Sequence, residues 1–185
     1  MSKPAPKDHQ LTEEEYLEME LTSPIKHEYV AGRLFAMTGA SDAHNIIALN
    51  LASILRNHLR GSPCRVFMSD LKLKVGEADA YYYPDLMVSC EKAPDSHYRE
   101  QPVLIVEVLS DSTAKQDTGG KWRAYQTLET LREYALVAQE CMDVRIYRRE
   151  ESGWTMSIYT DGAVIPFNSV ELEIPIERIY EEAWD

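Results

Sequence analysis

One stretch of eight residues, VLIVEVLS at 103–110, places the strongest constraint on the fold. In an extended strand the side chains alternate between two faces, and here both faces carry apolar residues. A strand that is apolar on both faces is typical of the centre of a sheet covered by helices. The sequence therefore predicts a central strand at this place.

Helix and strand patterns interleave along the rest of the chain. Thr12 and Glu15 form a capping-box pattern, which predicts the start of a short helix. Ala31-Gly32 lies between two strand-like halves, and a glycine that tolerates positive φ favours a tight turn. We therefore expect an N-terminal helix followed by a β-hairpin at about 26–37.

A long amphipathic helix is expected after Asp42, which can cap it, because apolar residues recur at helical spacing up to about Leu59. Strand patterns follow at 65–75, 83–89, 133–138, 144–149 and 154–159, and helical patterns at 114–130 and after Pro175. The expected fold class is therefore α/β (α+β), with a mixed central β-sheet flanked by helices.

The length and the N-terminal composition limit the organisation of the chain. A length of 185 residues fits one domain with a substantial core, which we expect to span 11–185. Residues 1–10 contain two prolines and no periodicity, as a flexible arm does. Neither an export signal nor an apolar segment of membrane-spanning length is evident, so we expect a cytoplasmic protein of bacterial type and no membrane partner.

Charge and cysteine content narrow the function further. A formal net charge of −12 argues against a protein that coats nucleic acid by bulk electrostatics, so any DNA contact must use a local basic patch. Cys64, Cys90 and Cys141 contain no CxxC pair and are odd in number. That spacing matches neither a zinc site nor a disulfide framework, and we expect all three to be reduced.

Glu107 interrupts the apolar central strand and needs an explanation. An isolated buried carboxylate is costly, so it must take up a proton or meet a cation or hydrogen-bond donors. Asp85 poses the same problem at the start of another strand, directly after Pro84. Two neighbouring strands that each present one carboxylate would form an oxygen-only site, which suits a hard divalent ion such as Mg²⁺.

A basic residue on the following helical segment could complete such a site. Asp117, Lys121 and Tyr125 are spaced four residues apart, so they would lie along one helix face. Lys121 could then lean over the carboxylates and support an attacking hydroxide or a scissile phosphate. Glu28 on the hairpin and His44 at the start of the long helix are further candidates.

An ordered set of motifs resembles the Uma-type restriction endonuclease family, a branch of the PD-(D/E)XK nuclease superfamily that was long catalogued as a domain of unknown function. The resemblance runs from about Leu11 to Tyr180. It rests on the motifs HEYVAGRLFAM, SDLKLKV, YPDLMV, PVLIVEVLSDST, DTGGKWRAY, LREYALV and VRIYRR, with His44 after the first.

The resemblance implies a restriction-endonuclease-like core and a DNA endonuclease that depends on Mg²⁺ or Mn²⁺. By position, Asp85 matches the Asp of the superfamily motif and Glu107 matches its second acidic residue, both as metal ligands. The chain departs from the pattern at Leu109, where the superfamily has a lysine, and Lys121 matches the lysine that the Uma-type pattern carries on the following helix. Glu28 would be an accessory ligand or base.

Structural interpretations compete with each of these roles. Glu107 could belong to an interior ion pair with Arg123 or Lys121, and Asp117 with Lys121 could be an exposed pair on a helix surface. Asp85 could be a turn residue, and His44 a packing residue. Lys72 and Lys74 could follow a phosphate backbone, but we expect them on a solvated strand face. Tyr81-Tyr82-Tyr83 could stack on bases, but we expect aromatic packing or a dimer contact.

Three functions remain open at this point. The first is a metal-dependent endonuclease. Such an enzyme could act as a homodimer, because one subunit could then cut each strand of a duplex. The second keeps the nuclease fold without the chemistry, as a module that binds nucleic acid or a protein, which Leu109 and the negative charge favour. The third is a metal-assisted hydrolase of small phosphate compounds.

Overall fold

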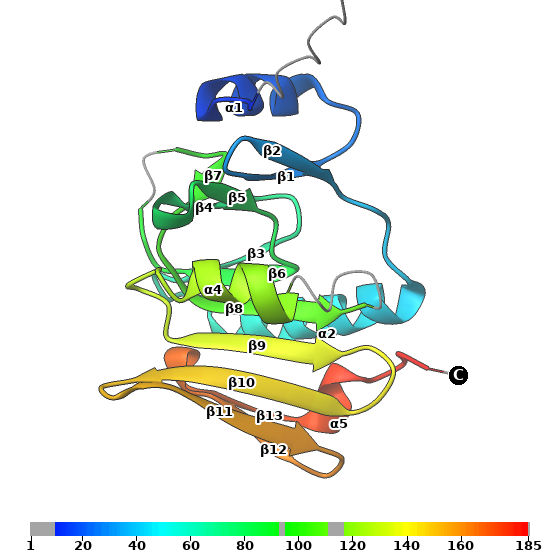
Figure 1. Cartoon of the computed structure of the whole chain (residues 1–185). Coiled ribbons are helices and arrows are strands. Elements are labelled where there is room, and N and C mark those ends of the chain that lie inside the picture. The colour runs from blue at the N-terminus through cyan, green and yellow to red at the C-terminus, as the bar shows by residue number, and fades with distance from the viewer. Residues whose placement is uncertain (1–9, 93–94, 111–116, 185) are drawn as a thin grey trace, which may run out of the picture.

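The computed structural model describes residues 10–92, 95–110 and 117–184. Figure 1 shows helix α1 (Glu13–Thr22) at one end of the molecule, above a first sheet, with a second sheet beyond it and helix α2 (Asp42–His58) on the far side of that sheet. Of the expected arm at 1–10, only Gln10 lies within the described residues.

The described strands form three sheets. The first has the order β2-β1-β5-β4-β7 and contains β1 (His27–Val30), β2 (Arg33–Ala36), β4 (Lys72–Val75), β5 (Ala80–Tyr82) and β7 (Tyr98–Arg99). The second has the order β11-β10-β9-β8-β6-β3 and contains β3 (Arg65–Met68), β6 (Leu86–Ser89), β8 (Pro102–Leu109), β9 (Glu133–Ala138), β10 (Asp143–Glu150) and β11 (Gly153–Thr160). The third is the pair β12 (Val164–Phe167) and β13 (Leu172–Pro175).

Short helical turns complete the described part of the chain. They are η1 (Gly76–Ala78), the π-helical turn η2 (Asp117–Lys121), α4 (Trp122–Tyr125), η3 (Asn168–Val170) and α5 (Ile176–Ile179). Together with the sheets they give the mixed α+β fold that the sequence predicts.

Strand β8 is the central strand, as its apolar pattern predicts. It pairs antiparallel with β6 and parallel with β9, which makes the second sheet a mixed one. Leu104, Val106 and Val108 pack into the core beside α2, and Ile105 packs into a second core between the two large sheets. Glu107 therefore points toward the space between the sheets.

The N-terminal elements follow their local sequence signals. Thr12 and Glu15 form the expected capping box of α1. Ala31 and Gly32 both have positive φ at the hairpin turn, +47° and +82°. The cap of α2 is Ser41 and not Asp42, because the Ser41 side chain accepts the His44 N–H while Asp42 is already helical.

Two expected elements are divided in the structure. The segment 65–75 forms β3 and β4 in different sheets, with a turn at residues 69–71 between them. The strand expected at 83–89 begins only at Leu86, because residues 83–85 connect the two sheets in the same way. The two connections bring the end of β5 and the start of β6 to the space between the sheets.

The helix expected at 114–130 ends earlier than predicted. Its described part is the π-helical turn η2 followed by the single turn α4, which ends at Tyr125. Residues 114–116 lie outside the described part. Gly119 and Gly120 stand in this turn, and glycine is among the weakest helix formers.

The expectation of three reduced cysteines is wrong for two of them. Cys64 and Cys90 form a disulfide, whereas Cys141 is free and exposed. The two cysteines flank the paired residues Arg65 and Ser89 of β3 and β6, so the sheet places them side by side. In the described part of the chain, none of the helices combines the length and hydrophobicity needed to cross a membrane.

Candidate active site

Asp85 and Glu107 lie opposite each other on neighbouring chain segments. The register that pairs Leu86 with Val106 places them side by side at the start of β6. The backbone N–H of Asp85 donates to Glu107 Oε2 at 3.3 Å, and the N–H of Val108 donates to Asp85 Oδ2 at 2.8 Å. Each carboxylate is thus oriented by the backbone of the other strand.

Lys121 extends from η2 into a group of three carboxylates. Its Nζ lies 3.0 Å from Glu28 Oε1, 3.1 Å from Asp117 Oδ1 and 3.2 Å from Glu107 Oε1. All four side chains are buried, and they come from β1, β8 and η2. The lysine therefore ties the first sheet, the second sheet and the π-helical turn together.

Two further residues contact the acidic pair. The Tyr125 hydroxyl donates to Glu107 Oε1 at 3.0 Å, and His44 Nε2 lies 3.2 Å from Asp85 Oδ2. His44 reaches Asp85 from the first turn of α2, and its pKa is raised chiefly by its hydrogen bond to that carboxylate. The pKa of the Tyr125 hydroxyl is raised, first by burial and then by the charge of Glu107.

The concentration of acids dominates the electrostatics. Burial raises the pKa of Glu107 well above its usual range; Lys121 opposes this shift, and Asp117, Asp85 and Glu28 add to it. Burial alone would lower the pKa of Lys121, but Glu107, Glu28 and Asp117 outweigh it and hold that pKa well above its usual range. The lysine is therefore an ammonium at neutral pH.

The donor set fits a divalent cation at Asp85 and Glu107. Both are carboxylates, the Asp85 side chain is 18% exposed, and a cation would offset the burial and the neighbouring acids that raise the pKa of Glu107. Among the described residues, no three His, Cys, Asp or Glu side chains are grouped to hold a metal ion by themselves. Water or substrate oxygens would complete the coordination, as they commonly do for Mg²⁺.

The structure brings together every residue that the sequence analysis singled out for the site. They are Glu28, His44, Asp85, Glu107, Asp117, Lys121 and Tyr125, joined by the contacts given above.

The burial of the charged side chains decides between the structural interpretations of this site. Arg123 is exposed, so the buried partner of Glu107 is Lys121. The pair of Asp117 and Lys121 exists but is buried, which contradicts the expectation of an exposed pair. Burial of Lys72 also contradicts the solvated face expected for Lys72 and Lys74, since only 8% of Lys72 is exposed.

Aromatic residues around the site belong to the packing that supports it. Tyr81, Tyr82 and Tyr83 are all buried, as expected for packing residues. Sequence analysis missed Tyr134, whose hydroxyl donates to the backbone carbonyl of Asp117 at 3.0 Å and so fixes the start of η2. It also missed the Asp85 and Val108 N–H groups, because backbone donors leave no sequence signal.

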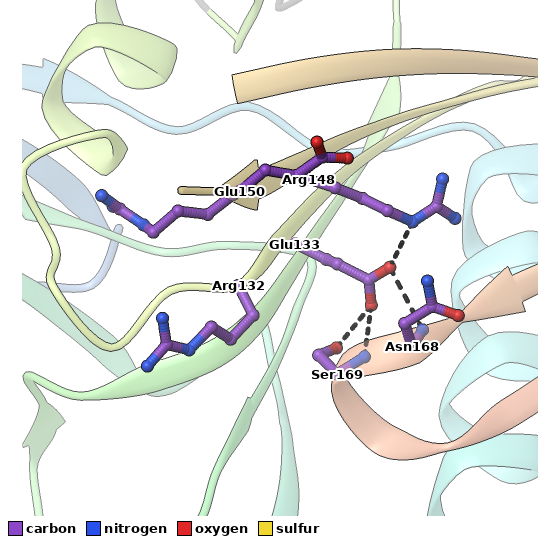
Figure 2. Close-up of a pocket in the computed structure, with 7 residues that line it drawn as sticks. Arg132, Glu133, Arg148, Glu150, Asn168 and Ser169 are labelled. Carbon is purple, nitrogen blue, oxygen red and sulfur yellow. Dashed lines mark hydrogen bonds and ion pairs between the residues drawn. The ribbon is translucent and has the colours of Figure 1, made fainter. Parts of the chain in front are cut away.

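A surface pocket lies elsewhere, between β9, β10 and η3 (Figure 2). The Glu133 carboxylate at its centre accepts from Arg148 Nε at 2.8 Å, from the backbone N–H groups of Asn168 and Ser169, and from the Ser169 hydroxyl. This carboxylate joins β12 and β13 to the second sheet. Its hydrogen-bonding capacity is used internally, so we assign it a structural role.

Comparison with known proteins places the chain in a family. Residues 13–177 match the family model described as "Uma2: Putative restriction endonuclease". Two proteins of Synechocystis sp. (strain ATCC 27184 / PCC 6803 / Kazusa) are similar over most of their length. "Uncharacterized protein slr1290" is 35% identical over 97% of this chain and 94% of its own length, and "Uncharacterized protein sll1609" is 32% identical over 88% and 95%.

A solved structure supports the fold independently. A crystal structure titled as "a putative nuclease belonging to DUF820" from Anabaena variabilis ATCC 29413 has a TM-score of 0.78 with this chain at 17% sequence identity. It covers 94% of this chain and 99% of its own length. With the family match over residues 13–177 and this shared fold, the chain belongs to the Uma2 family of restriction-endonuclease-like proteins.

Proposed function

We propose that this chain is a DNA endonuclease that hydrolyses phosphodiester bonds with Mg²⁺ or Mn²⁺. One observation carries the proposal: Asp85 and Glu107 lie side by side, each oriented by a backbone N–H of the other strand, next to the ammonium of Lys121. Carboxylates on neighbouring strands beside a lysine are the arrangement that a nuclease of the PD-(D/E)XK type needs. Membership of the Uma2 family supports the same reading.

In this proposal Asp85 and Glu107 hold the metal ion. When bound, the ion would lower the pKa of a coordinated water and neutralise charge on the scissile phosphate. His44 holds the Asp85 carboxylate in place, and Tyr125 holds Glu107. These two are positioning residues, because they act through the carboxylates.

Lys121 supplies a fixed positive charge next to Glu107. A preorganised charge of this kind stabilises negative charge that develops in a transition state without any rearrangement. Glu28 and Asp117 keep the ammonium oriented, and Glu28 is the accessory metal ligand or base of the site. The lysine thereby takes over the role of the missing motif lysine at Leu109, a half-buried residue that packs into the core between the sheets.

Cleavage of plasmid and oligonucleotide DNA with and without divalent ions tests the proposal. We expect the wild type to cleave with Mn²⁺ or Mg²⁺ and to stop in EDTA, and we expect Asp85→Asn and Glu107→Gln to lose activity at least 100-fold while remaining folded. Asp70→Asn is the matched control, because that carboxylate lies 88% exposed on the turn before β4. Cleavage that is equal in the wild type and both variants would exclude the assignment.

A panel of substrates separates this proposal from its alternative. Leu109 in the motif position favours a module of the same fold that binds nucleic acid or a protein without cutting. Salt-sensitive DNA binding in EDTA, with no cleavage in any metal, would support that module. RNA and small phosphate esters belong in the panel, because activity confined to either would change the substrate class.

The setting in which the protein acts is part of the same proposal. We propose a cytoplasmic location, where DNA is available, and a homodimer that cuts both strands of a duplex. The Cys64–Cys90 disulfide would be unusual in the cytoplasm, since cytosolic thiols are mostly kept reduced. Sedimentation equilibrium with and without DNA tests the dimer.

A further inference from the structure

Strand β2, at one end of the first sheet as described, carries two exposed side chains on the face that holds Glu28. Residues directly opposite each other in an antiparallel pair project to the same face. Phe35 is opposite Glu28, and Arg33 is opposite Val30, which packs against the core between the two large sheets. Leu34 packs on the other face, in the cluster that includes α1. Phe35 and Arg33 therefore project on the side of the candidate site.

Both side chains are available to a ligand. Phe35 is 44% exposed, and its ring stacks on no other ring of the described residues. Arg33 is exposed and forms no ion pair or hydrogen bond within the described part of the chain. Trp184, the other exposed aromatic side chain among the described residues, differs, because it stacks on Tyr180 and donates to the carbonyl of Gln139.

A short series of contacts connects Phe35 to the acidic pair. Opposite residues of an antiparallel pair have Cβ atoms about 4.5–5.5 Å apart, so Phe35 lies beside Glu28. Glu28 lies 3.0 Å from Lys121 Nζ, which lies 3.2 Å from Glu107. A DNA strand with its scissile phosphate at Glu107 and Asp85 would therefore pass Phe35 within a few nucleotides.

The two side chains suit the two parts of a nucleotide. A guanidinium binds phosphate through charge-assisted hydrogen bonds, and an aromatic ring offers a flat surface on which a base stacks. In a chain with a net charge of −12, an exposed arginine without an internal partner supplies the local positive charge that a DNA contact needs. A paired base inside a duplex already stacks on both faces, so stacking on Phe35 requires a base that is unpaired or unstacked.

We propose that Phe35 and Arg33 form a binding subsite for the substrate strand beside the scissile phosphate. Phe35 stacks on an unpaired base, and Arg33 binds a phosphate of the same strand. The inference rests on the proposed function, because it assumes that DNA is cleaved at Asp85 and Glu107. It goes further in naming a feature of the substrate, a base that is unpaired or becomes unstacked near the cleavage point.

Fluorescence anisotropy of a labelled single-stranded DNA oligonucleotide, in EDTA and in Ca²⁺, tests the subsite without cleavage. We expect Phe35→Leu, which keeps an apolar side chain without a ring, to weaken binding about 10-fold and Phe35→Tyr to bind like the wild type. Arg33→Gln should also weaken binding and reduce the salt dependence by about one phosphate contact. Phe35→Leu should leave the salt dependence unchanged, and its effect on a blunt duplex of the same sequence should be smaller.

Matched controls make the same kinds of change elsewhere. Arg178→Gln alters an arginine that is 63% exposed in α5. Trp184→Leu removes the other exposed aromatic ring. Ile179 of α5 packs in the core beside α2, on the face of the second sheet away from the candidate site. Both control variants should bind the oligonucleotide as the wild type does.

The outcomes separate this inference from the proposed function. Equal affinity of the wild type, Phe35→Leu and Arg33→Gln, or no binding by the wild type, would overturn the subsite. Cleavage of DNA with Mn²⁺ in either case would leave the proposed function standing. Conversely, weakened binding in both variants of a protein that cuts no DNA would support the subsite and contradict the endonuclease.

Two further results would assign Phe35 another role. An equal loss of affinity in Phe35→Tyr and Phe35→Leu would exclude stacking as the source of the effect. Unchanged DNA affinity in Phe35→Leu, together with a change from dimer to monomer in sedimentation equilibrium, would assign this edge of the sheet to a second copy of the chain. Either result would overturn the proposed base contact.

Discussion

Glu107 lies in an otherwise apolar strand, and the contacts of its two oxygens explain how a carboxylate is tolerated there. One oxygen accepts from Lys121 and Tyr125, and the other accepts from the backbone of Asp85. A buried charge without such partners would cost several kcal/mol. Burial and the neighbouring acids nevertheless raise the pKa of Glu107, so its ionised form is still destabilised and a further cation nearby would stabilise it.

A substitution at His44 tests whether this residue positions the Asp85 carboxylate. Its imidazole holds Asp85 Oδ2, and loss of a group that orients a metal ligand typically costs 10–100-fold in affinity. We expect His44→Ala to weaken Mn²⁺ binding about 10-fold, as measured by calorimetry. His97→Ala is the control, because the His97 side chain is 63% exposed on a loop. Equal affinity of His44→Ala and the wild type for Mn²⁺ would show that His44 does not position a metal ligand.

The π-helical turn η2 carries both Asp117 and Lys121 and is the most unusual element of the site. Such turns are rare and occur frequently at functional sites. A Cβ added at Gly120 would meet no atom within 4 Å, so space does not explain the glycine. Gly32 differs, because its Cβ would lie 2.6 Å from Gln10 Cβ and its φ is +82°.

The two glycines should therefore respond in opposite directions to alanine. Gly120→Ala is expected to raise the free energy of unfolding by about 0.5–1 kcal/mol, because alanine restricts the unfolded chain and favours a helical turn. Gly32→Ala is expected to lower it. Urea unfolding measures both, and a destabilised Gly120→Ala would show that the turn requires glycine for its geometry.

The attachment of α1 to the first sheet predicts a dependence on pH. Glu13 accepts from Lys74 at 2.6 Å and from the Tyr81 hydroxyl at 2.6 Å, and the hydrogen bond from Lys74 is the main reason why its pKa is lowered. A lowered pKa means that the stabilisation is present above the unfolded-state pKa and is lost as the pH falls through the folded one. Glu13→Gln should be less stable than the wild type by about 0.5 kcal/mol at pH 7, the scale of a partly exposed pair. In acid denaturation curves this difference should shrink as the pH falls below the unfolded-state pKa of about 4.3 and vanish below the lowered pKa of Glu13; a difference that stays constant across the acid range would contradict the assignment.

Elements with strong periodicity could be predicted from the sequence, and those decided by tertiary pairing could not. In strand β8 and helix α2 the spacing of the apolar residues along the sequence already indicates which side chains are buried. The strands β12 and β13 are four residues each and form a two-stranded sheet, so their local pattern is weak. In the site, the acidic pair was predictable because a carboxylate in an apolar strand is conspicuous. The backbone donors that orient it depend on register.

At the scale of the whole molecule, the site lies where the two large sheets meet. Glu28 comes from the first sheet, Glu107 from the second, and Lys121 from the turn between β8 and β9. The chain passes from one sheet to the other at residues 69–71 and 83–85, close to Asp85. The fold thus gathers the site residues from segments far apart in the sequence (Figure 1).

The disulfide is a second feature that only the assembled sheet reveals. Cys64 and Cys90 are 26 residues apart, and their spacing predicted no bond, but β3 and β6 bring them together. Closing a loop of this length contributes about 3 kcal/mol by the chain-entropy model. We expect Cys64→Ser with Cys90→Ser to lose about 2–4 kcal/mol of stability in urea under oxidising conditions. Stability unchanged by the double substitution would mean that the bond does not form in solution.

Anomalous diffraction from crystals soaked in Mn²⁺ would locate a bound ion without any assumption about substrate. We expect one peak within bonding distance of Asp85 and Glu107, with Lys121 still in contact with Glu28. A peak elsewhere, or none at this pair in crystals that hold Mn²⁺ at other sites, would contradict a metal-dependent active site at Asp85 and Glu107.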